Sequence, residues 1–294
     1  MSSPIPPMRL HVFRDSARFG RRLADATQLP LARVAVHRFP DAETLVCIRP
    51  PAGRHAVVVR SLHDPNSKLI ETLLAADALR RAGAERVTLI APYLPYMRQD
   101  AVFAPGQPIS QRVVGDLLGR AFDRVLTVEA HLHRVQRLCE VVGPRSRSLS
   151  VAPALAHWLR RTGDCVVVGP DAESEPWIRA IARASGLPWM VGRKQRLSDR
   201  SVRVQFSTAA PCRRAVVVDD IASSGVTLAV AARALRRRGI ATVDAIVVHA
   251  IFTPGALARI RAAGVRHVIS CDTVPHATNA IGVAPLFAPL LCSR

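Results

Sequence analysis

The chain has 294 residues, and its 49% hydrophobic content is enough for one large or two medium domains with substantial cores. Its 41 basic residues outnumber 22 acidic ones, which gives a net charge of +19. Only Lys68 and Lys194 are lysines, so 39 of the 41 are arginine, and neither a basic tail nor an aromatic platform accompanies them. This distribution argues against specific nucleic-acid binding, and we interpret most of the arginines as a solvated surface.

The six cysteines are scattered without a CxxC spacing, and several lie in apolar runs. This arrangement predicts reduced core residues rather than disulfides or zinc ligands. The stretch MSSPIPPMRL lacks the features of a signal peptide, and no apolar run reaches the roughly 18 residues that a membrane span needs. We therefore expect a cytoplasmic protein in a reducing compartment, without a membrane partner.

Strands and helices alternate along the first half of the chain. Continuous or alternating apolar runs predict strands, and apolar residues at helical spacing predict helices. The expected strands are 32–39, 43–48, 55–61, 85–92 and 123–130, and the expected helices are 68–83 and 109–122.

The second half repeats this alternation. Its expected strands are 165–170, 187–192, 213–220, 242–252 and 266–272, and its expected helices are 175–186, 228–239 and 255–264. We therefore predict an α/β protein with two related domains, residues 1–147 and 148–294, each with a mainly parallel sheet flanked by helices. Residues 85–100 and 213–225 are expected to occupy similar places, since each is a strand that follows a glycine-bearing turn.

The stretch RAVVVDDIASSGVT, residues 214–227, joins a buried strand to a helix. Ligands bind at such junctions, because the helix start directs free N–H groups into the crevice at the strand ends. The small residues let backbone amides wrap an anion, and the hydroxyl side chains add donors. Asp219 and Asp220 would repel a phosphate, but they can accept hydrogen bonds from sugar hydroxyls beside it or lie near a metal. A phosphate site is predicted, although acidic strand ends before capped helices also occur in α/β proteins of every kind.

Seven motifs occur in the order found in the ribose-phosphate pyrophosphokinase family. They are FPDAE at 39–43, PYLPYMRQD at 92–100, PGQPIS at 105–110, VEAHLH at 128–133, GPDAE at 169–173, RKQR at 193–196 and VVVDDIASSGVT at 216–227. The chain resembles this family over nearly its whole length, and PYLPYMRQD and DDIASSGVT are the most specific matches.

The resemblance implies two phosphoribosyltransferase-like domains. It also implies transfer of the pyrophosphoryl group of ATP to the anomeric hydroxyl of ribose 5-phosphate, which gives phosphoribosyl pyrophosphate (PRPP) and AMP. Dependence on Mg²⁺ and a homo-oligomer built from dimers are further implications of family membership.

The same resemblance assigns residues to roles. Lys194 and Arg196 match two catalytic cations that stabilise the transition state. The ribose 5-phosphate set is Asp171, Asp219, Asp220, Ala222, Ser223, Ser224, Gly225, Val226 and Thr227. The ATP set is Phe39, Asp41, Glu43, Arg98, Gln99, Asp100 and His131. His131 and Asp171 also match metal positions, and in the family the Phe39 segment reaches the adenine of a neighbouring subunit.

Three departures from the family pattern bear on these assignments. Ala42 and Val226 replace glycines, and Glu129 replaces an aspartate. Because a β-branched valine resists positive φ, we expect the phosphate loop to close with a different geometry.

Other functions fit parts of the sequence. A catalytically weak regulatory relative of the family would share its motifs, but the retained Lys194, Arg196, His131 and Asp171 favour an active enzyme. A PRPP-using phosphoribosyltransferase would explain the loop after Asp220 and leave PYLPYMRQD without a role. An RNA-binding module would explain only the charge.

Overall fold

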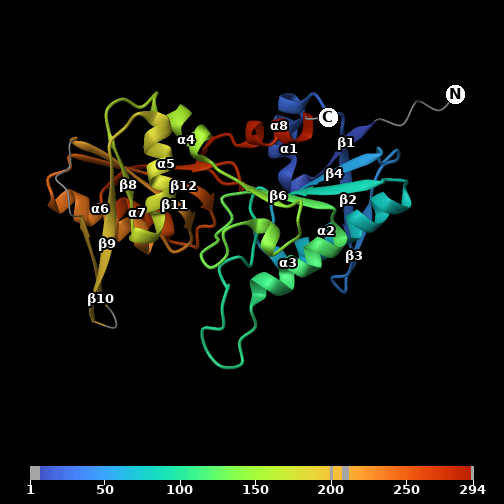
Figure 1. Ribbon diagram of the computed structural model, residues 1–294, viewed down its shortest axis with the longest axis horizontal. Helices are drawn as coiled ribbons and strands as arrows, with labels where there is room; N and C mark the ends of the chain where they lie inside the picture. The colour runs from blue at the N-terminus through green and yellow to red at the C-terminus, as the bar shows by residue number, and fades with distance from the viewer. Residues whose placement is uncertain (1–6, 199–200, 207–211, 293–294) are drawn as a thin grey trace. The chain divides into compact units, whose positions relative to one another are not determined.

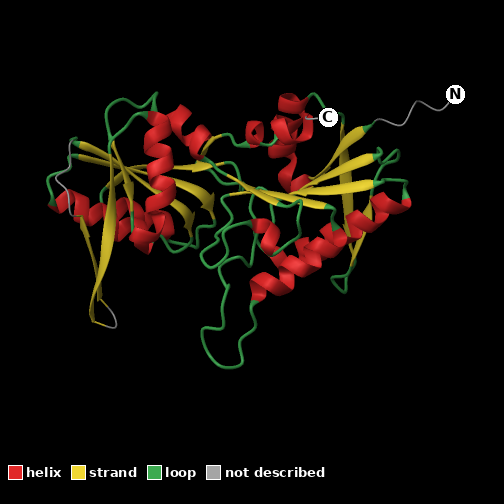
Figure 2. Ribbon diagram, in the orientation of Figure 1, coloured by secondary structure: helices red, strands yellow, loops and turns green. Residues whose placement is uncertain are grey.

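The computed structural model describes residues 7–198, 201–206 and 212–292, with the backbone alone at 194–198 and 201–204. The chain forms two compact units, one of residues 1–149 and 284–294 and one of residues 150–283. Each unit holds a mainly parallel sheet flanked by helices (Figure 2), which confirms the predicted fold class. Within the described ranges, no helix has the length and apolar character needed to cross a membrane.

The first unit contains a seven-stranded sheet with the order β3-β2-β1-β4-β5-β6-β7 (Figure 1), in which β2 and β3 pair antiparallel and the other neighbours pair parallel. Its strands are β1 Met8–Phe13, β2 Leu31–Arg38, β3 Thr44–Cys47, β4 His55–Val59, β5 Arg86–Ile90, β6 Arg124–Val128 and β7 Arg147–Leu149. Its helices are α1 Ala17–Thr27, α2 Pro65–Arg81, α3 Ser110–Ala121 and α8 Ala288–Cys292, with short 3-10 turns η1 Arg14–Ser16, η2 Leu138–Glu140 and η4 Ala284–Leu286.

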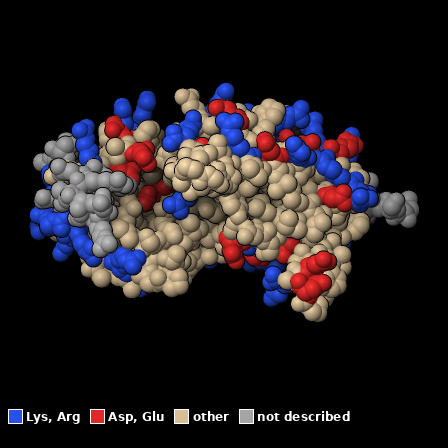
Figure 3. All heavy atoms as spheres, turned by 90° about the horizontal axis from the view of Figure 1, so that it is seen from below, with Lys and Arg blue, Asp and Glu red and all other residues tan. Residues whose placement is uncertain are grey.

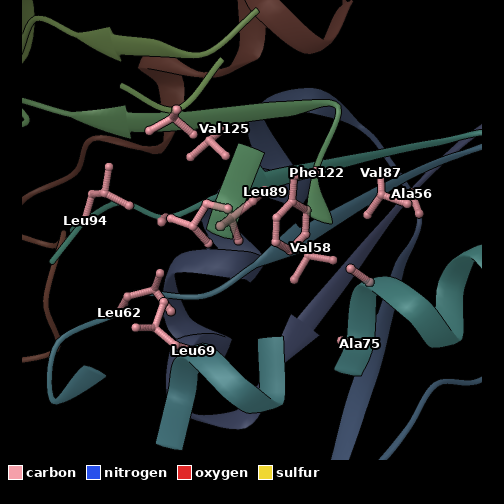
Figure 4. Packing of buried hydrophobic residues seen from close by; sticks show 14 of the residues in the cluster. Ala56, Val58, Leu62, Leu69, Ala75, Val87, Leu89, Leu94, Phe122 and Val125 are labelled. Carbon is pink, nitrogen blue, oxygen red and sulfur yellow. The ribbon is translucent and has the colours of Figure 1, made fainter. Parts of the chain in front are cut away.

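The core of this unit forms where helix α2 packs on the central strands. Val58 of β4 and Leu89 of β5 have no exposed surface, and Leu69 of α2 belongs to the same buried cluster (Figure 4). These short β-branched and aliphatic runs form strands because both of their faces are covered. Truncating a fully buried leucine such as Leu89 to alanine would cost about 2–5 kcal/mol of stability.

The last residues of the chain return to the first unit. Phe287 is fully buried, and its ring meets Phe19 of α1 edge-on with the centroids 5.8 Å apart. The guanidinium of Arg124 donates a hydrogen bond to the carbonyl of Leu290. Residues 284–292, which the sequence-based division assigns to the C-terminal half, therefore help to build the core of the first unit.

The second unit repeats this topology, with the strand order β10-β9-β8-β11-β12-β13-β14 and an antiparallel pair only at β9 and β10 among its described strands. The strands are β8 Val166–Gly169, β9 Trp189–Ser198, β10 Ser201–Phe206, β11 Arg214–Ala222, β12 Thr242–Ala250, β13 Val265–Cys271 and β14 Asn279–Ile281. The helices are α4 Ala152–Leu159, α5 Glu175–Ser185, α6 Val226–Arg237 and α7 Ala256–Ala262, with the 3-10 turn η3 Ala172–Ser174.

The two strand orders show which elements correspond. Strand β11 takes the place that β4 has in the first unit, and β5 corresponds to β12. The expected equivalence of residues 85–100 and 213–225 is therefore wrong. A glycine-bearing turn followed by an apolar run precedes many strands of a parallel sheet, so that pattern does not specify a strand's position.

Candidate active site

The strand order of each sheet changes direction at one point, which lies between β1 and β4 in the first unit and between β8 and β11 in the second. Ligands of open α/β sheets bind in the crevice outside the carboxyl ends of the strands at such a point. In the second unit, Asp171 follows β8, and Asp219 and Asp220 lie near the end of β11. The sheet therefore brings together three predicted ribose-binding carboxylates that are distant in sequence.

Strand β11 positions the two adjacent aspartates. Its residues Ala215 to Val218 are fully buried between the parallel neighbours β8 and β12. Asp219 accepts a hydrogen bond from the N–H of Asp220 at 3.1 Å, and Asp220 accepts one from the N–H of Ile221 at 2.8 Å. These local bonds hold the carboxylates at the strand end.

The carboxyl of Asp219 is buried beside two other carboxylates. Burial raises the pKa of its carboxyl well above the usual value, and the negative charges of Asp220 and Asp171 raise it further. Such a cluster of carboxylates is stabilised by hydroxyl donors or by a cation, both of which a sugar phosphate with its metal would bring.

The predicted phosphate loop follows the carboxylates directly. Ala222 ends β11, Gly225 is the N-cap of α6 with a φ of 73°, and Val226 is the first helical residue. The first N–H groups of α6 lack partners within the helix, as at every helix start, and can bind an anion. Val226 does not adopt positive φ. Gly225 takes the left-handed conformation instead, so the valine is not strained there, and a loop geometry that differs from the family's stays a prediction.

Two residues from neighbouring segments fix this loop. The N–H of Thr253 donates a hydrogen bond of 3.1 Å to the carbonyl of Ser223. The guanidinium of Arg259 in α7 donates to the carbonyl of Ser224. Gly225 lies so close to Ile260 that an added Cβ would be only 2.8 Å from its Cγ1 atom. The loop is thus held from outside by α7 and the turn before it.

Two of the predicted ATP-binding segments meet at the carboxyl edge of the first unit. Asp100, in the loop after β5, pairs with Arg134, in the loop after β6, at 3.5 Å. The Asp100 side chain is only 5% exposed, and its Oδ2 atom has no hydrogen-bond partner among the described residues. Gln99 is held by the N–H of Gln111, at 3.1 Å, and by the hydroxyl of Ser110. The loops therefore present a fixed, partly unsatisfied polar surface.

His131 belongs to the second of these loops. Its ring meets that of His133 edge-on with the centroids 4.0 Å apart. The residue two positions before it, Glu129, has a φ of 37°, which is unusual for a residue with a side chain. Strained backbone of this kind often occurs at ligand sites.

The third predicted ATP-binding segment is the turn between β2 and β3. Phe39 is 41% exposed, and the N–H of Glu43 donates to the Asp41 carboxylate at 3.1 Å. Three strand spacings separate β2 from β5, or about 14 Å. The strands that carry this turn and residues Arg98 to Asp100 are therefore not neighbours in the sheet.

Comparison with known proteins identifies the family. The family model described as the N-terminal domain of ribose phosphate pyrophosphokinase matches residues 8–121, and the phosphoribosyl transferase domain model matches residues 145–285. The chain belongs to the ribose-phosphate pyrophosphokinase family.

Individual relatives agree with this assignment. The ribose-phosphate pyrophosphokinase of Methanopyrus kandleri is 36% identical, over 92% of this chain and 94% of that protein. That of Brucella melitensis is 31% identical, over 95% and 91%. The crystal structure of phosphoribosylpyrophosphate synthetase from Mycobacterium smegmatis superposes with a TM-score of 0.84 at 26% identity and covers 97% of both chains.

The two family cations lie on a β-hairpin of the second unit (Figure 1). Along β9, Lys194 pairs with Val204 of β10, and Arg196 pairs with Val202. The sequence predicts a strand at 187–192. The observed strand β9 continues beyond residue 192 and includes the basic motif. The side chains of Lys194 and Arg196 lie outside the part that the structure describes, so their catalytic roles stay predictions.

The carboxylates at the end of β11 fit the Mg²⁺ ion that the family implies. Mg²⁺ prefers oxygen ligands and is commonly held by one or two carboxylates together with waters and substrate phosphates. Asp171, Asp219 and Asp220 supply such oxygens. Within the described ranges, no group of three or more His, Cys, Asp or Glu residues is arranged to hold a metal ion. His131 lies in the other unit, and its role as a metal ligand stays a prediction.

Sequence reasoning missed the residues that support the site. Thr253, Arg259 and Arg134 each contact a predicted site residue or loop, but they lie 26 or more positions from it in sequence. In the sequence, Thr253 and Arg134 are marked only by their position in a loop after a strand, and Arg259 by its position in the helix that follows. The same signal marks many residues without a role.

Proposed function

We propose that this chain transfers the pyrophosphoryl group of ATP to the anomeric hydroxyl of ribose 5-phosphate, which gives PRPP and AMP. One observation carries the proposal. In a member of the pyrophosphokinase family, a fixed phosphate loop directly follows the cluster formed by Asp171, Asp219 and Asp220. That arrangement matches a phosphorylated sugar, with its phosphate in the loop and its hydroxyls on the carboxylates.

The second unit positions the acceptor. The phosphate binds residues Ala222 to Thr227, and Asp219 and Asp220 accept hydrogen bonds from the 2- and 3-hydroxyls. This leaves the anomeric hydroxyl free for in-line attack on the β-phosphorus, where a new O–P bond forms as the bond to AMP breaks. Fixing both ends of the sugar gives the rate advantage of orientation.

Negative charge grows on the transferred group as the bond to AMP breaks. Lys194 and Arg196 are the proposed cations that stabilise it. Asp171 would help to hold Mg²⁺, and His131 matches a metal position of the family. When bound, Mg²⁺ would neutralise phosphate oxygens. Arg98, Gln99 and Asp100 hold the nucleotide.

The proposal includes a homo-oligomer in which Phe39, Asp41 and Glu43 bind the adenine of a neighbouring chain. The exposure of Phe39 supports this arrangement, as does the position of β2, which is not a neighbour of β5 in the sheet.

The outer surfaces of α2 and α3 also support an oligomer. They expose Ile70 and Leu74, and Val113 and Leu117, which are four positions apart on each helix. Figure 3 shows a broad uncharged area on this side of the first unit. Apolar surface of this kind is typical of subunit contacts. The six cysteines all lie in the described ranges and are free; Cys165 and Cys271 are buried, whereas Cys47 and Cys292 are exposed. A cytoplasmic location stays part of the proposal.

Purified protein incubated with ATP, Mg²⁺ and ribose 5-phosphate tests the activity. We expect AMP and PRPP in equal amounts, resolved by ion-exchange chromatography. Absence of both products from folded protein would favour the regulatory relative instead.

Mixing two inactive variants tests the shared site. Phe39→Ala and Lys194→Ala proteins should each be nearly inactive, while co-expressed hetero-oligomers should regain part of the activity, since some interfaces pair two intact residues. Folded hetero-oligomers no more active than the sum of the variants would place the ATP pocket within one chain.

A further inference from the structure

The long connection between β5 and α3 carries Arg98, Gln99 and Asp100, which are three of the predicted ATP-binding residues (Figure 1). This connection forms neither a helix nor a strand between residues 91 and 109. A loop holds a side chain accurately only where other groups fix its backbone. The contacts that fix the backbone around Arg98 therefore bear on nucleotide binding.

A single residue of α3, Gln111, binds the backbone on both sides of Arg98. Its side-chain amide donates a hydrogen bond of 3.2 Å to the carbonyl of Met97, and its main-chain N–H donates one of 3.1 Å to the carbonyl of Gln99. Gln111 is only 2% exposed, and Met97 is 1% exposed. The bond to Met97 is thus shielded from water, and its loss would leave a buried carbonyl without this partner.

The backbone just before Met97 has a conformation that needs support. Tyr96 has a φ of 65°, in the left-handed region that residues with a side chain rarely adopt. Its hydroxyl donates a hydrogen bond to the side-chain oxygen of Asn66 in α2. Such conformations persist only where the surrounding structure holds them. Asn66 and Gln111 supply contacts of this kind from two helices.

Arg98 differs from the residues on either side of it. It is exposed, and within the described ranges its guanidinium forms no hydrogen bond or ion pair, whereas Met97 and Gln99 are both held by Gln111. A guanidinium can hold two phosphate oxygens in its planar fork. When the backbone that carries it is already fixed, less conformational freedom is lost on binding, and the affinity for the ligand is higher.

We propose that Gln111 is a positioning residue for the nucleotide site. It holds the carbonyls on both sides of Arg98 and so fixes the backbone from which that arginine binds ATP. Because Gln111 is buried, it acts through Met97 and Gln99 rather than by contact with the nucleotide. This role rests on the proposed function, in which Arg98 holds ATP, and it adds a residue outside the predicted ATP set.

Replacing Gln111 with methionine tests the role, because methionine has a similar length and keeps the main-chain N–H but has no amide to donate. The probe is α,β-methylene ATP with Mg²⁺, which cannot transfer its pyrophosphoryl group, so calorimetry measures binding without the reaction. We expect the Kd of this analogue to rise about tenfold, the effect of one lost hydrogen bond to a buried carbonyl. Ribose 5-phosphate, which binds the second unit, should keep its affinity.

Hydrogen exchange followed by mass spectrometry gives a readout that does not depend on a ligand. Residues 97–100 should exchange faster in Gln111→Met, while strands β4 and β5 keep their protection, because the change loosens one segment only. Gln28→Met is the matched control, since the side-chain amide of Gln28 also donates to a backbone carbonyl, that of Asp25 in α1, at 2.7 Å. This control should change neither the exchange of residues 97–100 nor the Kd of the analogue.

If Gln111→Met does not fold, Gln111→Glu repeats the test, because an ionised carboxylate keeps the shape of the glutamine side chain without a hydrogen to donate. An unchanged Kd of the analogue in a folded variant would overturn the role of Gln111 alone. So would faster exchange throughout the first unit, since the glutamine would then stabilise the fold rather than the segment. An unsubstituted protein that does not bind the analogue would overturn the ATP site and, with it, this inference.

Discussion

Replacing Gly225 with alanine is the sharpest test of the phosphate loop. Gly225 joins β11 to α6 with a φ of 73°, a conformation that residues with a Cβ rarely adopt. A Cβ built there would lie 2.8 Å and 2.9 Å from the Cγ1 and Cδ1 atoms of Ile260 and 3.1 Å from the carbonyl oxygen of Ala256. Both helix α7 and the loop would have to move.

The magnitude follows from two separate costs. The left-handed conformation costs about 1 kcal/mol for alanine, and the close contacts with α7 cost about 1–3 kcal/mol by overpacking. Gly225→Ala should therefore lose about 2–4 kcal/mol, divided between folding stability and binding of ribose 5-phosphate. If the whole cost falls on the loop, KM for ribose 5-phosphate rises about 30-fold for 2 kcal/mol and about 700-fold for 4 kcal/mol.

A second glycine provides the control. Gly239 follows α6 with a φ of 85°, and a Cβ there would meet nothing within 4 Å. Gly239→Ala should therefore lose only about 1 kcal/mol of stability and keep its KM. Urea unfolding and initial rates against ribose 5-phosphate measure both quantities. If the two variants show the same stability and the same KM, the contact of Gly225 with α7 does not position the loop.

Four further predictions use other parts of the site. Ala42→Gly should raise the free energy of unfolding by about 1 kcal/mol, because Ala42 has a φ of 74°; an unchanged urea midpoint would contradict this. Asp219→Asn should lower turnover yet stabilise the ligand-free protein by about 1 kcal/mol. The raised pKa of Asp219 makes its ionisation unfavourable in the folded state, so this gain should be largest above that pKa and vanish where the carboxyl is protonated; thermal melts across pH check the sign. Arg259→Ala should raise KM for ribose 5-phosphate about fivefold through loss of its bond to the loop, whereas Arg261→Ala on the same helix should not; steady-state kinetics decide. Lys194→Ala should lower kcat with little change in KM, because its charge acts on the transition state; near-normal turnover would exclude this lysine from the mechanism.

The sequence predicts the local structure of residues 214–227 well, because these residues are adjacent. Residues 214–227 contain a strand, two carboxylates, a turn and a helix start in one run, so local rules suffice to place them. To place Asp171 beside these carboxylates, the order of the strands is also needed. Asp171 is distant in sequence but follows β8, the parallel neighbour of β11. Local patterns and a parallel sheet together bring these carboxylates to one edge.

Features that depend on distant partners could not be predicted in this way. Strand β1 and helix α1 are absent from the expected elements, although Phe19 of α1 packs against Phe287 near the end of the chain. Here the stabilising contact is with a segment that no local pattern identifies. Strand β10 and the basic part of β9 are also missing from the expected elements, since the apolar run that predicts a strand ends at residue 192.

The two points of strand reversal show why topology locates a ligand site without naming the ligand. Both sheets have the same strand order, so each forms a crevice at the ends of its first and fourth strands. One crevice gathers Asp171 and Asp219, whose mutual repulsion favours a hydroxyl-rich ligand or a cation. The other holds Arg14 beside Arg60, which is paired with Asp15 and Glu71. The topology therefore forms a crevice in each unit, and the side chains at the strand ends set the charge that a ligand meets there.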